Sequence, residues 1–265
     1  MPDGEPDPGL EFSVLGSSSS GNSTLVRGGR TCILVDAGLP VNYMMDKVVE
    51  LGGSGSIDAI LVSHEHSDHI RSLFPLAKRA SCPIYISSPV YWYLGAREGF
   101  DVRELKDRCT VRIKDLSVTP FLVAHDAIDP FGFVIEGCGG SLGMVTDCGS
   151  FDEGVRSMLS GRDGLIVESN YDVDMLRKGV YPASLKRRIQ DPKGHLSNDQ
   201  CRELLGGVIG PTTREIVLAH LSEENNDPLL ALETSMKALH NDDGMTNIHV
   251  SYPKCPTSVL RAFRQ

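Results

Sequence analysis

Residues 63–69 read SHEHSDH and place four side chains of metal-binding type within six positions: His64, His66, Asp68 and His69. They directly follow the apolar run 57–62, which we expect to be a buried strand. Side chains at the end of a strand are held by rigid backbone and can point into a common cavity. Such dense clustering of ligand types favours a metal site over the alternative, a solvated polar loop or helix-capping region.

The spacing within this stretch indicates how it could be used. In extended backbone His64 and His66 share one face, whereas Asp68 and His69 lie beyond a turn and point elsewhere. One short loop could thus supply two neighbouring ions. Imidazole and carboxylate ligands suit zinc, and also manganese or iron.

The same pattern recurs three times further along the chain. His125 follows the apolar segment 118–123, Asp147 follows 142–145, and His220 follows 216–218. Taken singly, each would more often be a cap or turn residue. Together with residues 63–69, they indicate one site built from several strand ends.

Length and composition limit the architecture. The chain has 265 residues and shows no linker, so we expect one domain over residues 10–265 behind a disordered, proline-rich tail at 1–9. The 27 glycines and 15 prolines favour a turn-rich α/β or all-β fold over a helical bundle. Short strands are expected in the first half, after which helices (152–159, 182–189, 198–208, 228–240) alternate with strands (165–168, 215–219).

The cysteines and the apolar segments indicate the cellular compartment of the protein. The seven cysteines are odd in number, scattered and never in a CxxC pair, which favours a reducing cytoplasm over a disulfide scaffold. No apolar stretch approaches the ~18–20 residues that a membrane helix needs, and the acidic start does not look like a signal peptide. Cys148 lies beside Asp147 but has no spare histidine partner, so we interpret it as an inert buried thiol.

Charge limits the partners. A net charge of −9 does not attract nucleic acid non-specifically, so binding to nucleic acid would require a local basic patch. Residues 177–193 are such a candidate, because six basic residues stand there against the single acidic Asp191. The alternative interpretation is an ordinary solvated helix face.

The HxHxDH box, followed in order by His125, Asp147 and His220, resembles the metallo-β-lactamase superfamily. The resemblance implies a four-layer αββα sandwich with the site at the sheet edges. It also implies that His64, His66 and His125 hold one ion, that Asp68, His69 and His220 hold a second, and that Asp147 bridges both. Such a site would leave room for a hydroxide between the two ions.

Further segments narrow the resemblance. GHLSN at 194–198 is similar to the tRNase Z region in which a histidine contacts the scissile phosphate, a role that would fall to His195. GSSSSGNS at 16–23, HDAIDPFGF at 125–133 and AHLSEENND at 219–227 resemble the YycJ (WalJ) subgroup of single-domain metallo-hydrolases, which is similar to 5′-directed DNA exonucleases. Tyr171 departs from that pattern, since a histidine is expected after Asn170.

These considerations predict a phosphodiesterase with two divalent ions, zinc foremost, and with DNA favoured over RNA as substrate. Asp68 would orient the nucleophile or accept its proton, and His195 would donate to the phosphate or the departing oxygen. The expected substrate contacts are Ser19, Ser20, Asn22, Lys186, Arg187 and Ser197. Two alternatives remain open: a hydrolase of a small ester, thioester or cyclic phosphodiester, and a metal-stabilised regulatory protein without turnover. The sequence leaves the oligomeric state open.

Overall fold

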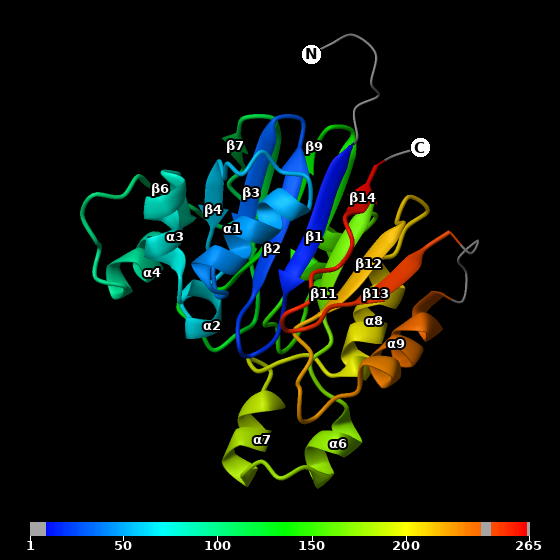
Figure 1. Cartoon of the computed structure of the whole chain (residues 1–265). Helices are drawn as coiled ribbons and strands as arrows, with labels where there is room; N and C mark the ends of the chain where they lie inside the picture. Colours follow the sequence, from blue (N-terminus) through cyan, green and yellow to red (C-terminus); the bar gives the residue numbers. More distant parts are fainter. Residues whose placement is uncertain (1–8, 240–244, 264–265) are drawn as a thin grey trace.

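Two seven-stranded sheets pack face to face in the computed structural model, which describes residues 9–239 and 245–263 (Figure 1). The first sheet contains, in spatial order, β14 (Leu260–Ala262), β1 (Leu10–Gly16), β2 (Ser23–Gly28), β3 (Thr31–Val35), β4 (Ala59–Leu61), β5 (Ile84–Ile86) and β6 (Val102–Glu104). The second contains β13 (Asn247–Val250), β12 (Glu215–Ala219), β11 (Gly164–Glu168), β10 (Gly140–Val145), β9 (Phe131–Gly137), β8 (Leu116–Leu122) and β7 (Val111–Ile113).

The helices are α1 (Val41–Glu50), α2 (Ser67–Ile70), α3 (Leu73–Ala80), α4 (Ser88–Tyr93), α5 (Glu153–Leu159), α6 (Val173–Lys178), α7 (Ala183–Ile189), α8 (Asn198–Val208) and α9 (Pro228–Met236), with a 3-10 turn η1 (Lys237–Leu239). None of the helices in these two described ranges is long and apolar enough to cross a membrane.

Each sheet is antiparallel on one side and parallel on the other. β14, β1, β2 and β3 pair antiparallel, and β3 to β6 pair parallel. In the second sheet β7 to β10 are antiparallel and β10 to β13 are parallel. Parallel neighbours end at the same edge of a sheet, and that edge is where α/β sheets bind ligands.

Three apolar clusters create the layers. The central one joins the inner faces of both sheets, for example Phe12 and Ile33 of the first with Phe133 and Ile166 of the second. The second cluster packs α1 and α3 on the outer face of the first sheet, and the third packs α5 and α8 on the outer face of the second. The predicted four-layer αββα sandwich is therefore confirmed.

α6 and α7 stand apart from these layers and project below the strand ends (Figure 1). α7 has no buried residue, and α6 buries only Leu176. The Lys186 ammonium ties the two helices together by donating to the carbonyl oxygens of Arg177 (2.9 Å) and Gly179 (2.6 Å). We call residues 173–189 the α6–α7 arm.

The expected elements largely correspond to these bounds, with differences at the margins. Of the predicted tail, residues 1–8 lie outside the described residues, while Gly9 is buried. The predicted helix 228–240 changes to a 3-10 turn at Lys237, and its last residue is also outside the described part. The short elements α4, α6, β6, β13 and β14 were not expected.

Candidate metal centre

Three strand ends aim polar side chains at one edge of the sandwich. Asp36, Asp147 and His220 directly follow or closely follow β3, β10 and β12, and their φ angles are 64°, 53° and 56°. Such left-handed backbone is uncommon for residues other than glycine and is found at functional sites. All three side chains are buried at this edge, where the loop 63–69 also lies.

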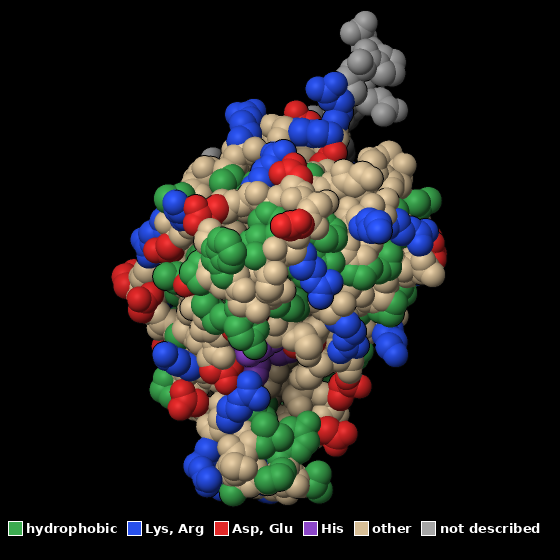
Figure 2. Space-filling model, turned by 90° about the vertical axis from the view of Figure 1, so that its left-hand side faces the viewer, with side chains coloured by type: hydrophobic (Ala, Val, Ile, Leu, Met, Phe, Trp, Pro, Cys, Tyr) green, Lys and Arg blue, Asp and Glu red, His purple; other side chains and the backbone are tan. Residues whose placement is uncertain are grey.

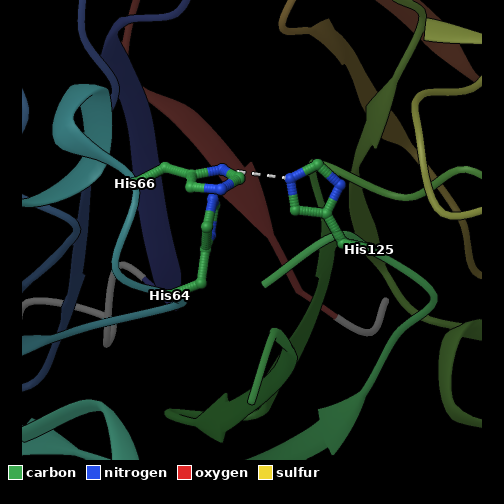
Figure 3. Close-up of side chains that lie close together, drawn as sticks. All are labelled: His64, His66 and His125. Carbon is green, nitrogen blue, oxygen red and sulfur yellow. Dashed lines mark hydrogen bonds between the residues drawn. The ribbon is translucent and has the colours of Figure 1, made fainter. Parts of the chain in front are cut away.

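The structure brings together all seven side chains predicted to be ligands. Donor atoms within 4.8 Å of one another form overlapping groups: His64, His66 and His125; His64, His69 and Asp147; Asp68, His69 and His220; and Asp147, Glu168, His195 and His220. Figure 3 shows the first group, in which the His125 Nε2 lies 3.2 Å from the His66 Nδ1. Asp147 reaches the other side of the cluster, with Oδ2 3.1 Å from the His69 Nε2 and Oδ1 3.3 Å from the His220 Nδ1.

Three of the histidine rings, those of His125, His69 and His220, are held so that Nε2 faces the shared space. Nδ1 of His125 donates to the Gly194 carbonyl oxygen at 3.0 Å, and Nδ1 of His69 donates to Asp36 at 2.7 Å. Nδ1 of His220 donates to Glu168 at 2.9 Å. A histidine that donates through Nδ1 presents the Nε2 lone pair, which is the usual arrangement of a metal-binding imidazole.

Two buried ring nitrogens without a hydrogen-bond partner in the described ranges indicate that the cluster fits a metal ion. Considering only the residues that the structure describes, Nε2 of His64 and Nε2 of His220 are buried and make no hydrogen bond. Buried polar atoms are almost always satisfied, so such atoms call for a partner. The surrounding set of imidazoles and carboxylates has the chemistry that zinc, manganese and iron accept.

The charge balance of the cluster supports the same fit. Burial holds the pKa of His64 well below its usual value, which keeps this imidazole neutral as a ligand must be. Burial would raise the pKa of Asp147, but the neighbouring His220 and His69 imidazoles hold it well below its usual range. The same carboxylate, with Asp36, raises the pKa of His69 against the effect of burial. The site therefore demands positive charge, from protons or from a cation.

Glu168, at the end of β11, positions two histidines of the cluster, although the sequence analysis did not single it out. The carboxylate is fully buried, and Oε1 accepts from Nδ1 of His195 (2.8 Å) and of His220 (2.9 Å). Oε2 accepts from the backbone N–H of Cys148 (2.9 Å) and of Leu196 (3.0 Å). Burial alone would raise the pKa of Glu168, but the adjacent imidazoles lower it to about 2.

Asp36, directly after β3, positions His69 in the same way, and the sequence analysis did not single it out either. Its Oδ1 accepts from the Ser63 backbone N–H and its Oδ2 from the Ser63 hydroxyl, each at 2.8 Å. The same Oδ2 accepts from His69. Asp36 thus fixes both the His69 ring and the start of the loop 63–69; an acidic residue directly after an apolar strand was the available signal.

His195 lies at the edge of the cluster. Its ring centroid is 5.1 Å from that of His220 and 5.3 Å from that of His125, and its side chain is 20% exposed. It also lines a cavity of about 260 Å³ formed by Ser19, Asp126, Asn170, Tyr181, Leu185, Arg188, Ile189, Gly194, His195 and Ser222. We call this cavity the arm pocket, because α7 supplies one of its walls.

Of the predicted substrate contacts Ser19, Ser20, Asn22 and Ser197, two are exposed and two are buried. Ser19 and Ser20 are exposed, and Ser19 lines the arm pocket. Asn22 is buried, and its Nδ2 donates to Asp68 Oδ2 at 3.0 Å, so it braces a ligand candidate. Ser197 is buried as the N-cap of α8, where it accepts from the Gln200 N–H.

The basic segment reaches the site through a different residue from those expected. Lys186 braces the arm, and Arg187 is exposed and does not line the arm pocket. Arg188 lines the pocket, and its Nε donates to Asp126 Oδ2 at 2.7 Å. Asp126 Oδ1 in turn lies 3.4 Å from the His125 Nε2. In Figure 2 histidines lie in a depression with a basic side chain directly beside them.

Cys148 is the inert thiol that was expected. It is fully buried, and burial raises its pKa to about 12. A thiol held protonated in this way is a poor nucleophile.

The fold and the donor cluster define a class, which comparison with known proteins identifies. The family model described as "Beta-lactamase superfamily domain" matches residues 31–221. The chain therefore belongs to the metallo-β-lactamase superfamily, as the resemblance implied, and its donor set makes it a metal-dependent hydrolase.

Within the superfamily, the relatives that match over most of the chain include two named exodeoxyribonucleases. "Exodeoxyribonuclease YycJ" of Bacillus anthracis is 34% identical over 95% of this chain and 98% of its own length. "Exodeoxyribonuclease WalJ" of Streptococcus pneumoniae serotype 2 is 33% identical over 89% of this chain and 90% of its own. The metallo-β-lactamase fold protein YhfI of Bacillus subtilis shares the fold, with a TM-score of 0.72 at 15% identity over 94% of this chain and 99% of its own.

Proposed function

We propose that this protein is a deoxyribonuclease that removes nucleotides from the 5′ end of DNA with the help of two divalent ions, zinc foremost. The observation that carries the proposal is the convergence of seven imidazole and carboxylate side chains on one space, where two buried nitrogens, Nε2 of His64 and Nε2 of His220, have no hydrogen-bond partner among the described residues. The two exodeoxyribonuclease relatives, similar over almost the whole chain, direct the proposal to DNA.

The residues that would hold the ions follow the donor groups. His64, His66 and His125 would hold one, Asp68, His69 and His220 the other, and Asp147 would lie between them. Two bound ions would supply a hydroxide at neutral pH and offset the charge that develops on the phosphoryl group.

The chain's own residues would do the remaining work. Asp68 is partly open to the site, and its Oδ2 can accept a proton or orient a water molecule. Glu168 occupies Nδ1 of His195, which leaves Nε2 to donate to the phosphate or the departing oxygen. Arg188, exposed at the rim, can exchange its bond to Asp126 for one to a phosphate.

The test is an end-labelled digestion. Purified protein, reconstituted with zinc, manganese or iron, is incubated with 5′- and 3′-labelled DNA and RNA, and with bis(p-nitrophenyl) phosphate and thioesters. We expect mononucleotide release from the 5′ end of DNA. Turnover of thioesters or small esters with no digestion of DNA would overturn the proposal.

Two histidine variants test whether the predicted ligands are required for activity. His66→Ala should abolish metal-dependent digestion while the fold persists, because it removes a donor at the exposed side of the cluster. His249→Ala is the matched control, since that histidine pairs with Glu215 on β12 and belongs to none of the donor groups. Equal activity of His66→Ala and the wild type would contradict the assignment.

His195→Ala tests the proton donor. We expect slower turnover with unchanged metal content, because His195 is proposed to contact substrate and not metal. Loss of metal in this variant would instead assign His195 to the ligand set with Asp147 and His220, which its position also brings within reach.

A further inference from the structure

The arm pocket combines apolar and polar lining residues. Tyr181, Leu185 and Ile189, within and directly before α7, supply apolar surface. The polar side chains of Ser19, Asn170 and Ser222 also line it. An aromatic ring with apolar neighbours and hydrogen-bonding groups suits a nucleobase, because the base stacks through its faces and makes hydrogen bonds through its edge.

The position of the pocket relates it to the reacting centre. His195 belongs both to its lining and to the donor cluster, so whatever fills the pocket lies directly beside the proposed scissile phosphate. Arg188 also lines the pocket, which provides a guanidinium for a phosphate attached to the same occupant.

The size of the pocket limits the occupant. About 260 Å³ is below the ~300–1,000 Å³ of pockets that enclose drug-sized ligands. It suits one nucleoside better than a longer segment of a strand. An enzyme that works from an end can use such a pocket to seat the terminal unit while it cuts the bond behind that unit.

We infer that the arm pocket holds the 5′-terminal nucleoside of the DNA strand, with its base against Tyr181 and Leu185. This inference rests on the proposed function and adds the part of the molecule that recognises the strand end. It follows that the terminal base must be unpaired to enter, so the enzyme acts on single-stranded ends or frays a duplex by one base pair.

The experiment combines protein variants with altered DNA, so that the side chain of Tyr181 and the terminal base are removed separately and together. One 5′-phosphorylated single strand carries a normal first nucleotide, and a second carries an abasic sugar at that position. The quantity measured is kcat/KM for release of the first residue by the wild type, Tyr181→Ala and Leu185→Ala. Tyr93→Ala is the matched control, because Tyr93 is a 68% exposed tyrosine on α4 that does not line the pocket.

We expect Tyr181→Ala to lower kcat/KM for the intact strand roughly 5- to 100-fold, the usual effect of losing a base–aromatic stack. The loss should nearly vanish on the abasic strand, and Leu185→Ala should show the same dependence on the base to a smaller extent. Tyr93→Ala should show none. Coupling of this kind between a side chain and a substrate group indicates direct contact.

The outcomes separate the two proposals. If the wild type digests the intact strand but Tyr181→Ala and Leu185→Ala lose equal activity on both strands, the pocket assignment is overturned and the exonuclease proposal stands. If the wild type digests neither strand, the proposed function is overturned and the pocket assignment falls with it. Tyr181→Phe, which keeps the ring, should retain the wild-type dependence on the base.

Discussion

Replacing Glu168 by glutamine tests whether this carboxylate sets the tautomers of the histidines in the centre. Glutamine keeps the size of the side chain and one acceptor oxygen, and replaces the other oxygen by an NH₂ donor. The backbone N–H groups of Cys148 and Leu196 can only donate, so the remaining oxygen should stay with them. The NH₂ group then faces Nδ1 of His195 and Nδ1 of His220, both of which now donate.

The magnitude follows from that mismatch. To accept from the NH₂ group, His220 must move its proton to Nε2, the nitrogen that would hold a metal. Loss of such an outer partner typically weakens metal binding ~10–100-fold, which corresponds to about 1.4–2.8 kcal/mol. We therefore expect the Glu168→Gln protein to fold but to bind zinc 10–100-fold more weakly at this side of the centre.

The assay is competition for zinc between the protein and a chromogenic chelator, with thermal unfolding of the metal-free protein measured in parallel. Glu215→Gln is the matched control, because Glu215 also pairs with a histidine in the second sheet, accepting from Nε2 of His249 at 2.7 Å, but outside the cluster. Wild-type zinc affinity and stoichiometry in Glu168→Gln would show that Glu168 does not set the tautomer of His220.

Three further variants test other parts of the account. Asp36→Asn should weaken zinc binding ~10–100-fold in the same competition, because Asp36 holds Nδ1 of His69; an unchanged affinity would remove it from the centre. Arg188→Gln should reduce the salt dependence of log KM for DNA by about one unit of slope, a larger change than Arg187→Gln produces; equal slopes would contradict a phosphate contact. Ser197→Ala should lower the free energy of unfolding by about 1 kcal/mol in urea denaturation, the usual effect of losing a helix cap, and an unchanged midpoint would contradict that role.

The candidate donors were predictable from the sequence because each stands at or near the end of an apolar strand, whereas the four-layer sandwich was implied by the resemblance of these motifs to a known superfamily. His125, Asp147 and His220 each stand within three residues of the end of an apolar strand, which is where the chain must turn. Strands such as β6 and β14 were not predictable in this way. They are three residues long and exist because they pair with β5 and β1, the latter almost the whole chain away.

The roles of Glu168 and Arg188 were not predictable from the sequence, because they depend on which segments the fold brings beside them. Glu168 reads as the last residue of an apolar strand, and only the approach of β12 and of the loop before α8 shows that it joins two histidines. Arg187 and Arg188 are adjacent and alike in sequence, but the orientation of α7 turns only Arg188 toward Asp126 and the pocket. Ser197 looked like a substrate group because a hydroxyl beside a functional histidine can be one, and the helix that begins there uses it as a cap.

The proposed function depends on two neighbouring cations, which imidazoles and carboxylates from separate strand ends would hold. The most direct measurement is an anomalous difference map from crystals of the protein grown with zinc. We expect two peaks in each chain, one among His64, His66 and His125 and the other among Asp68, His69 and His220, with Asp147 between them. A map with no peak at this edge of the sheets, although zinc is in excess, would contradict the proposed pair of cations.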